Sequence, residues 1–125
     1  MTLLTDSSST SVLGRETAAV LVARTDGVIV ATSREAEPML GRPVQELIGR
    51  QFVSAVLDDE HRIERDLVNH LLTLGKSGIV EAFLRRRVRV PVWLRFHFRA
   101  IPAAEGRPPF IVIVCSHAGS AAAQT

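Results

Sequence analysis

The sequence has 125 residues, of which 46% are apolar, and its formal net charge is only +2. This length suits one domain with a single hydrophobic core. No apolar run is long enough to cross a membrane as a helix, and the N-terminus lacks the basic and apolar segments of a signal peptide. A single cysteine excludes an internal disulfide and suits a reducing compartment, so we expect a cytoplasmic protein without membrane association.

The two ends of the sequence differ in composition from its centre. Residues 1–17 contain a cluster of serine and threonine, and we predict that they form a flexible arm or a short N-terminal cap. Residues 18–117 carry the apolar patterns of a folded domain. Residues 118–125 are rich in alanine and are interpreted as a linker stub. The sequence therefore predicts one domain with short extensions.

The domain begins with two predicted strands that are joined by a tight turn. Ala18–Ala23 is short, apolar and partly β-branched, which favours a buried strand over a helix. The chain then reverses at Thr25-Asp26-Gly27, because aspartate can bond its own backbone in a turn and glycine accepts a positive φ. Val28–Ala31 is predicted to return as the second strand.

Two short helices are predicted next. Thr32 and Glu35 have the spacing of a capping box, in which a pair of side chains satisfies free amides at a helix start. A second helix is predicted over Val44–Ile48, because the preceding proline suits a helix start and the following glycine suits a C-terminal cap. The connector Gln51–Leu57 is expected to contribute apolar side chains, including Phe52, to the core.

The most regular helical pattern runs from Glu60 to Leu74. Its apolar residues recur three and four positions apart, which is typical of an amphipathic helix with one buried stripe. Acidic residues at positions 58–60 suit the helix start, where exposed amides leave a positive potential. The stripe comprises Ile63, Leu67, Val68, Leu71, Leu72 and Leu74.

Three strands are predicted in the last third of the sequence. Val90–Ala100 alternates strictly and places Leu94 and Phe96 on the inward face. Ile79–Val88 has the same period, but the turn between these two strands has no glycine, so the pattern leaves their register open. Phe110–Cys115 is uniformly apolar and predicts a central strand of the sheet.

The order of these segments resembles that of a PAS domain. The run TDGVIVATSREAEPMLGRPVQELIGRQF is similar to that family's strand, turn, strand and short helices, and LDDEHR resembles the start of its longest helix. The resemblance spans residues 18–117. It implies an α+β fold in which a five-stranded antiparallel sheet carries short helices and one longer helix on one face. It also implies a sensory or regulatory module of a signal-transduction protein, which binds a small ligand in the helix-sheet cleft, mediates dimerisation, or does both.

A ligand pocket would lie where the apolar stripe of the long helix meets the inward face of the sheet. Both surfaces must be buried, and each offers the other an apolar partner. An uncoloured small ligand is compatible with such a lining. The side chains expected there are Leu67, Val68, Leu71 and Leu72 from the helix and Leu94, Phe96, Val112 and Val114 from the strands.

We expect no cofactor, no metal site and no enzyme activity. Asp58–His61 combines carboxylates with an imidazole, but consecutive residues at a helix start point in different directions, so we interpret them as a helix cap. Haem is not expected on His70, because alignment with haem-binding PAS domains places their ligand nearer Arg65. Flavin is not expected because the cysteine motif of light-sensing relatives is missing, and Cys115, the only thiol, lies in an apolar strand. No nucleophile has a suitable base nearby.

The sheet face opposite the helices is predicted to be rich in arginine and aromatic residues. Arginine and tryptophan are enriched at interface centres, so we predict that this face forms a homodimer or docks a partner signalling domain. A basic face that binds nucleic acid is the alternative, although the aromatic strings of RNA-binding sheets are missing. The N-terminal arm, with Val12 and Leu13, could instead cover the same face. The residues predicted there are Phe83, Arg85, Trp93, Arg95, His97 and Arg99.

Overall fold

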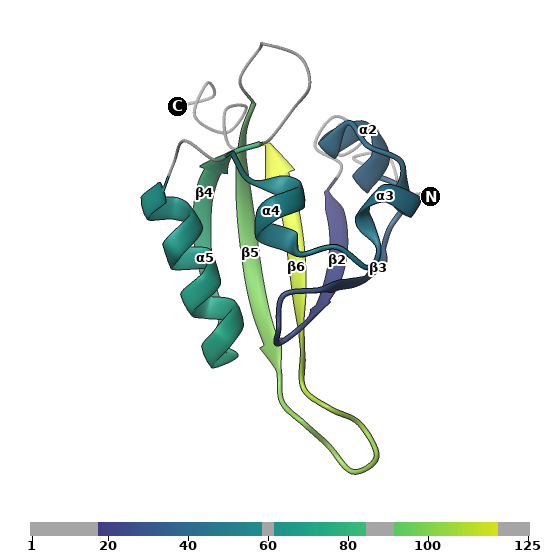
Figure 1. Cartoon of the computed structure of the whole chain (residues 1–125), viewed down its shortest axis with the longest axis vertical. Helices are drawn as coiled ribbons and strands as arrows, with labels where there is room; N and C mark the ends of the chain where they lie inside the picture. The colour runs from purple at the N-terminus through teal and green to yellow at the C-terminus, as the bar shows by residue number, and fades with distance from the viewer. Residues whose placement is uncertain (1–17, 59–61, 85–91, 118–125) are drawn as a thin grey trace, which may run out of the picture.

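The computed structural model describes residues 18–58, 62–84 and 92–117 of the chain. Within them, a five-stranded antiparallel sheet has the strand order β3-β2-β6-β5-β4, and helices α2 to α5 lie on one of its faces (Figure 1). The predicted α+β fold class is therefore confirmed. The elements are β2 Ala19–Arg24, β3 Ile29–Thr32, α2 Ala36–Leu40, α3 Val44–Leu47, α4 Phe52–Val56, α5 Arg62–Leu74, β4 Gly78–Phe83, β5 Trp93–Ile101 and β6 Phe110–His117.

The turn between β2 and β3 forms as predicted and also fixes the start of α4. The Asp26 carboxylate accepts a hydrogen bond from the Val28 amide at 3.1 Å, and Gly27 has a φ of 91°, which a residue with a side chain rarely adopts. The Gln51 side-chain amide donates to the Asp26 carbonyl at 2.8 Å, and the Phe52 amide donates to the Gly27 carbonyl at 2.8 Å. The turn therefore holds Phe52 against the middle of the sheet.

The predicted capping box of Thr32 and Glu35 does not form. α2 begins at Ala36, and Glu35 stands at its N-cap position without a side-chain cap hydrogen bond. The backbone before the helix is held by the sheet instead. The Ser33 amide donates to the Val20 carbonyl at 2.8 Å, and the Val20 amide donates to the Ser33 hydroxyl at 2.9 Å. Because of these bonds, the chain stays extended past Thr32, the residue at which the capping-box spacing predicts that the helix begins.

The long helix α5 covers the β4 side of the sheet (Figure 1). It runs from Arg62 to Leu74, close to the predicted bounds, whereas residues 59–61 lie outside the described part of the chain. Val68 and Leu72 are its buried residues. None of the helices in the described residues combines the length and the apolar character that a membrane span needs.

The register of the C-terminal strands is set by long antiparallel ladders. β4 pairs with β5 from Gly78 opposite Phe98 to Phe83 opposite Trp93, although the residues of the turn itself lie outside the described part. β5 then pairs with β6, which is the central strand, as predicted. On the other side of β6, strand β2 pairs from Ala19 opposite Cys115 onwards. The first and last strands of the described residues are thus neighbours in the sheet.

Candidate functional site

The space between α4 and the sheet is filled by three phenylalanine rings. Phe52 contacts Phe96 with ring centroids 5.5 Å apart and Phe98 with centroids 5.8 Å apart, both in edge-to-face geometry. All three side chains have no exposed surface. Edge-to-face aromatic pairs stabilise a core beyond the area that they bury. The centre of the inner face is therefore a packed aromatic cluster in this structure.

Helix α5 presents only part of its apolar stripe to the sheet. Val68 and Leu72 are 0% and 2% exposed, and Leu71 is partly buried against the core. Leu67, by contrast, is 50% exposed, so its predicted position against the inner sheet face is wrong. The apolar residues of α5 cover a wider arc of the helix than the part that touches the sheet. Side chains three and four positions apart on a helix point in directions that differ by tens of degrees, so they cannot all face the sheet.

Strand β6 faces the opposite way from the prediction. Ile111, Ile113 and Cys115 are fully buried under the helices, whereas Val112 and Val114 lie on the outer face and are half-buried. Their predicted place in the inner pocket is therefore wrong. A uniformly apolar strand carries no alternation, so only its pairing with neighbouring strands decides which residues point inward. Leu94 and Phe96, whose strand does alternate, are buried as predicted.

The remaining candidates for chemistry in the core and on α5 are separated from one another. The Cys115 thiol is buried, and burial raises its pKa well above its ordinary value, so it is not a reactive thiolate. His70 lies on the exposed side of α5. The helix-cap cluster cannot be compared with its prediction, because residues 59–61 lie outside the described part of the chain.

The outer face of the sheet carries an aromatic pair at its β4 edge. Phe83 and Trp93 are opposite one another on neighbouring strands, and their rings meet with centroids 4.5 Å apart and an interplanar angle of 69°. Both side chains are half-buried. The alternation and the pairing expected for these two residues are therefore observed, while their role in an interface remains a prediction.

Glu81 connects this aromatic pair to an arginine. Its carboxylate accepts a hydrogen bond from the Trp93 indole N–H at 2.9 Å, and it accepts two from the Arg95 guanidinium at 3.0 Å each. The pKa of Glu81 is lowered because these hydrogen bonds stabilise its charged form. The bond from Trp93 has the largest effect, and those from Arg95 have the next largest. The tryptophan ring is thus held in one orientation on the outer face, and the charge of Arg95 is neutralised.

Four valines occupy the middle of the same face and are called here the outer valine patch. Val20 lies opposite Val114 and Val22 lies opposite Val112 across the β2–β6 ladder. Val20 is 36% exposed and the other three are half-buried. Directly opposed β-branched residues stabilise a sheet, but on this face they also leave an apolar surface next to solvent.

Polar residues of β5 border the outer valine patch. His97 pairs with Val114 and Arg99 with Val112 in the β5–β6 ladder, and both side chains are exposed. Arg85, which was expected on this face, lies outside the described residues. Sequence reasoning missed the valines and the role of Glu81. Known strand registers would have revealed both, because the β2–β6 pairing opposes the valines and the β4–β5 pairing opposes Glu81 and Arg95.

Comparisons with known proteins agree with the architecture. The family model described as the PAS fold matches residues 16–123, which is most of the chain. None of the curated proteins matches this chain significantly.

Several solved structures share the fold at low sequence identity. The PAS domain of the Cronobacter turicensis RpfR quorum-sensing receptor, in complex with BDSF, has a TM-score of 0.62 and 17% identity, over 81% of this chain and 93% of that one. The PAS-B domain of Drosophila melanogaster Cycle, with bound ethylene glycol, has a TM-score of 0.65 and 13% identity, over 79% and 98%. The N-terminal domain of a Marinobacter aquaeolei diguanylate cyclase with PAS/PAC sensor has a TM-score of 0.66 and 11% identity, over 81% and 94%. With the family match over residues 16–123, these likenesses establish that the chain belongs to the PAS fold family.

Proposed function

We propose that this chain is a regulatory domain of a signal-transduction protein and that its outer sheet face docks a second copy of the chain. PAS domains are generally sensory rather than catalytic, and structures similar to this one come from a quorum-sensing receptor and a diguanylate cyclase. The observation that carries the proposal is the outer valine patch, which lies on a face that no helix of the described residues covers (Figure 1).

The composition of the outer face suits a self-complementary contact. A two-fold dimer would place the outer valine patch of one protomer against that of the other, since both sides of such an interface are the same surface. Completing the burial of one partly exposed valine contributes about 1 kcal/mol. The Phe83–Trp93 pair would add a rigid aromatic edge, because the Trp93 ring is already fixed by Glu81.

Sedimentation velocity tests this proposal. Val20→Arg places a charge in the outer valine patch, and we expect it to convert a dimer to a monomer at tens of micromolar protein. Ile63→Arg is the matched control, because Ile63 is 74% exposed on α5 and lies away from the outer face. A wild-type chain that stays monomeric at high micromolar concentration contradicts self-association.

The fluorescence of Trp93 separates a dimer from coverage within one chain. It is the only tryptophan, so its emission reports directly on this face. A blue shift that grows with protein concentration supports a dimer. A blue shift that is independent of concentration and is lost when residues 1–15 are deleted means that the N-terminal arm covers the face instead.

A small ligand in the helix-sheet cleft is the second proposed function. It is supported by the bound ligands in similar structures and by the inward positions of Val68, Leu72 and Phe96. In this structure the Phe52 ring packs over the centre of the cleft, so a ligand would displace that ring or enter beside α5. Native mass spectrometry of the freshly purified chain is expected to detect an uncoloured apolar ligand. A mass equal to that of the polypeptide alone, before and after addition of medium-chain fatty acids, contradicts this function.

A further inference from the structure

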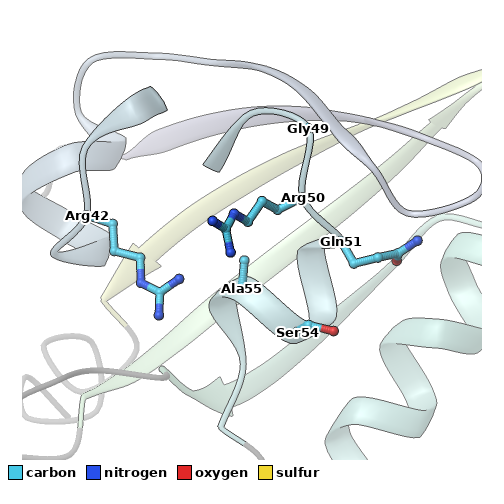
Figure 2. A pocket seen from close by; sticks show the side chains of 6 residues that line it. All are labelled: Arg42, Gly49, Arg50, Gln51, Ser54 and Ala55. Atoms are coloured by element: carbon cyan, nitrogen blue, oxygen red, sulfur yellow. The ribbon is translucent and has the colours of Figure 1, made fainter. Parts of the chain in front are cut away.

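A pocket with two arginines in its lining lies outside the helix-sheet cleft, on the surface formed by α4 and the ends of α2 and α3. Its volume is about 520 Å³, which is within the range of small-molecule sites. Figure 2 shows the side chains of Arg42 and Arg50 extending towards the same gap beside Ala55, whereas those of Gln51 and Ser54 point to the other side of α4. The residues that line the pocket are Arg42, Gly49, Arg50, Gln51, Ser54 and Ala55.

The fold brings the two arginines together through a repeated local feature. Each follows a glycine with a positive φ, which is 73° at Gly41 after α2 and 89° at Gly49 after α3. Such a glycine ends a short helix and redirects the chain. Two consecutive helices that end in Gly-Arg thus place both guanidinium groups over α4.

The backbone on either side of both arginines is fixed by hydrogen bonds. The Arg50 amide donates to the Leu47 carbonyl at 3.1 Å, and the Arg50 carbonyl accepts from the Ile29 amide at 2.9 Å. Next to Arg42, the Val44 amide donates to the Glu37 carboxylate at 2.9 Å. The backbone from which both arginine side chains extend is therefore fixed, and no ligand is needed to order it.

Neither guanidinium has a hydrogen-bond or ion-pair partner among the residues that the structure describes. This contrasts with Arg24, which pairs with Asp26 at 2.6 Å, and with Arg95, which pairs with Glu81. The acidic side chain of Glu37 is already engaged by a backbone amide. Two unpaired positive charges over one hollow repel each other, and an anion between them removes that repulsion.

We propose that this pocket binds a phosphorylated small molecule, with its phosphate group between Arg42 and Arg50. A phosphate monoester carries a charge of about −1.5 to −2 at pH 7, which matches two guanidinium groups better than a single carboxylate does. Planar guanidinium forks donate paired hydrogen bonds to phosphate oxygens. The pocket is larger than a phosphate group, so the ligand has further atoms besides its phosphate.

Amide chemical shifts of the isotope-labelled full chain test the proposal. Glucose 6-phosphate is the probe, glucose is its uncharged counterpart, and all titrations are run at constant ionic strength because surface electrostatics are screened by salt. We expect saturable shifts at Gly49, Arg50 and Ala55 with glucose 6-phosphate and none with glucose. Inorganic phosphate is expected to bind at the same amides with lower affinity.

Variants of the two arginines identify the groups that hold the phosphate. Arg42→Gln and Arg50→Gln are each expected to weaken glucose 6-phosphate binding about tenfold, the usual effect of one hydrogen-bonded charge. Arg34→Gln is the matched control on the exposed surface before α2, and it should change the affinity less than twofold. Arg50→Lys keeps the charge but loses the planar fork, so binding should weaken severalfold. Thermal unfolding of each variant checks that the fold is retained.

Several results overturn the proposal. They are an absence of saturable shifts, an equal loss of affinity in Arg34→Gln, and full retention of binding in the Arg42→Gln, Arg50→Gln double variant. Binding to an oligonucleotide but not to glucose 6-phosphate also overturns it, because the occupant is then a nucleic-acid backbone. None of these results depends on the outer sheet face, so the proposed dimer is tested separately.

Discussion

Truncation of two leucines on the same helix measures how α5 contacts the core. Leu72 is 2% exposed and Leu67 is 50% exposed, although both belong to the apolar stripe of α5. Leu72→Ala removes buried side-chain atoms and leaves a cavity, which costs about 3 kcal/mol, within the usual range for this substitution. For a domain of this size, such a loss lowers Tm by roughly 10 °C. Leu67→Ala leaves no cavity and gains helix propensity, so it should cost no more than about 1 kcal/mol.

Urea unfolding followed by helical circular dichroism measures both variants under identical conditions. Equal m-values would show that the two variants differ in stability rather than in the extent of unfolding. The two substitutions change the same atoms on the same helix, so their difference isolates burial. An equal loss of stability in Leu67→Ala and Leu72→Ala would refute the assignment of the helix faces.

Three further outcomes concern titration, reactivity and cofactors. The hydrogen bonds from Trp93 and Arg95 lower the pKa of Glu81 below its ordinary 4.5, so they stabilise the fold above that pH, and the stabilisation is lost as the pH falls through the lowered pKa. The free energies of unfolding of wild type and Glu81→Gln should therefore differ at neutral pH and become equal in acid. A difference that does not change with pH would show that the charge of the carboxylate does not contribute to stability. The buried Cys115 thiol should react with a thiol reagent only as fast as the chain unfolds, and immediate stoichiometric labelling would contradict its burial. The purified protein should be colourless, whereas a visible absorbance band that disappears in His70→Ala would reveal haem.

The parts of the fold that follow from local rules were predictable from the sequence. The Asp26-Gly27 turn has a side-chain acceptor and a residue suited to positive φ, and both act as expected. β5 alternates, so the inward positions of Leu94 and Phe96 follow directly. The C-terminal end of α5 follows from its apolar period and from the glycine after it.

The parts that depend on pairing between distant segments were not predictable. The inward face of β6 is decided by its ladders with β2 and β5, because its own residues are all apolar and give no phase. The capping box failed because the sheet retains Ser33, a contact between residues thirteen positions apart. The pocket between Arg42 and Arg50 requires α4 beneath both side chains, and no spacing in the sequence indicates that arrangement.

The adjacency of β2 and β6 has a mechanical consequence. These strands run antiparallel with Ala19 opposite Cys115, so the chain enters the domain and leaves it at the same end of the sheet. A force that separates the flanking segments would act across the two strands at one end of the ladder. It would break the hydrogen bonds one after another, whereas a shear force along the strands would load them all together. We therefore expect the domain to yield at low force when it is pulled by residues near 18 and 117. A displacement of the segments that flank the domain would therefore be transmitted to β2 and β6 first, and to the helices only afterwards.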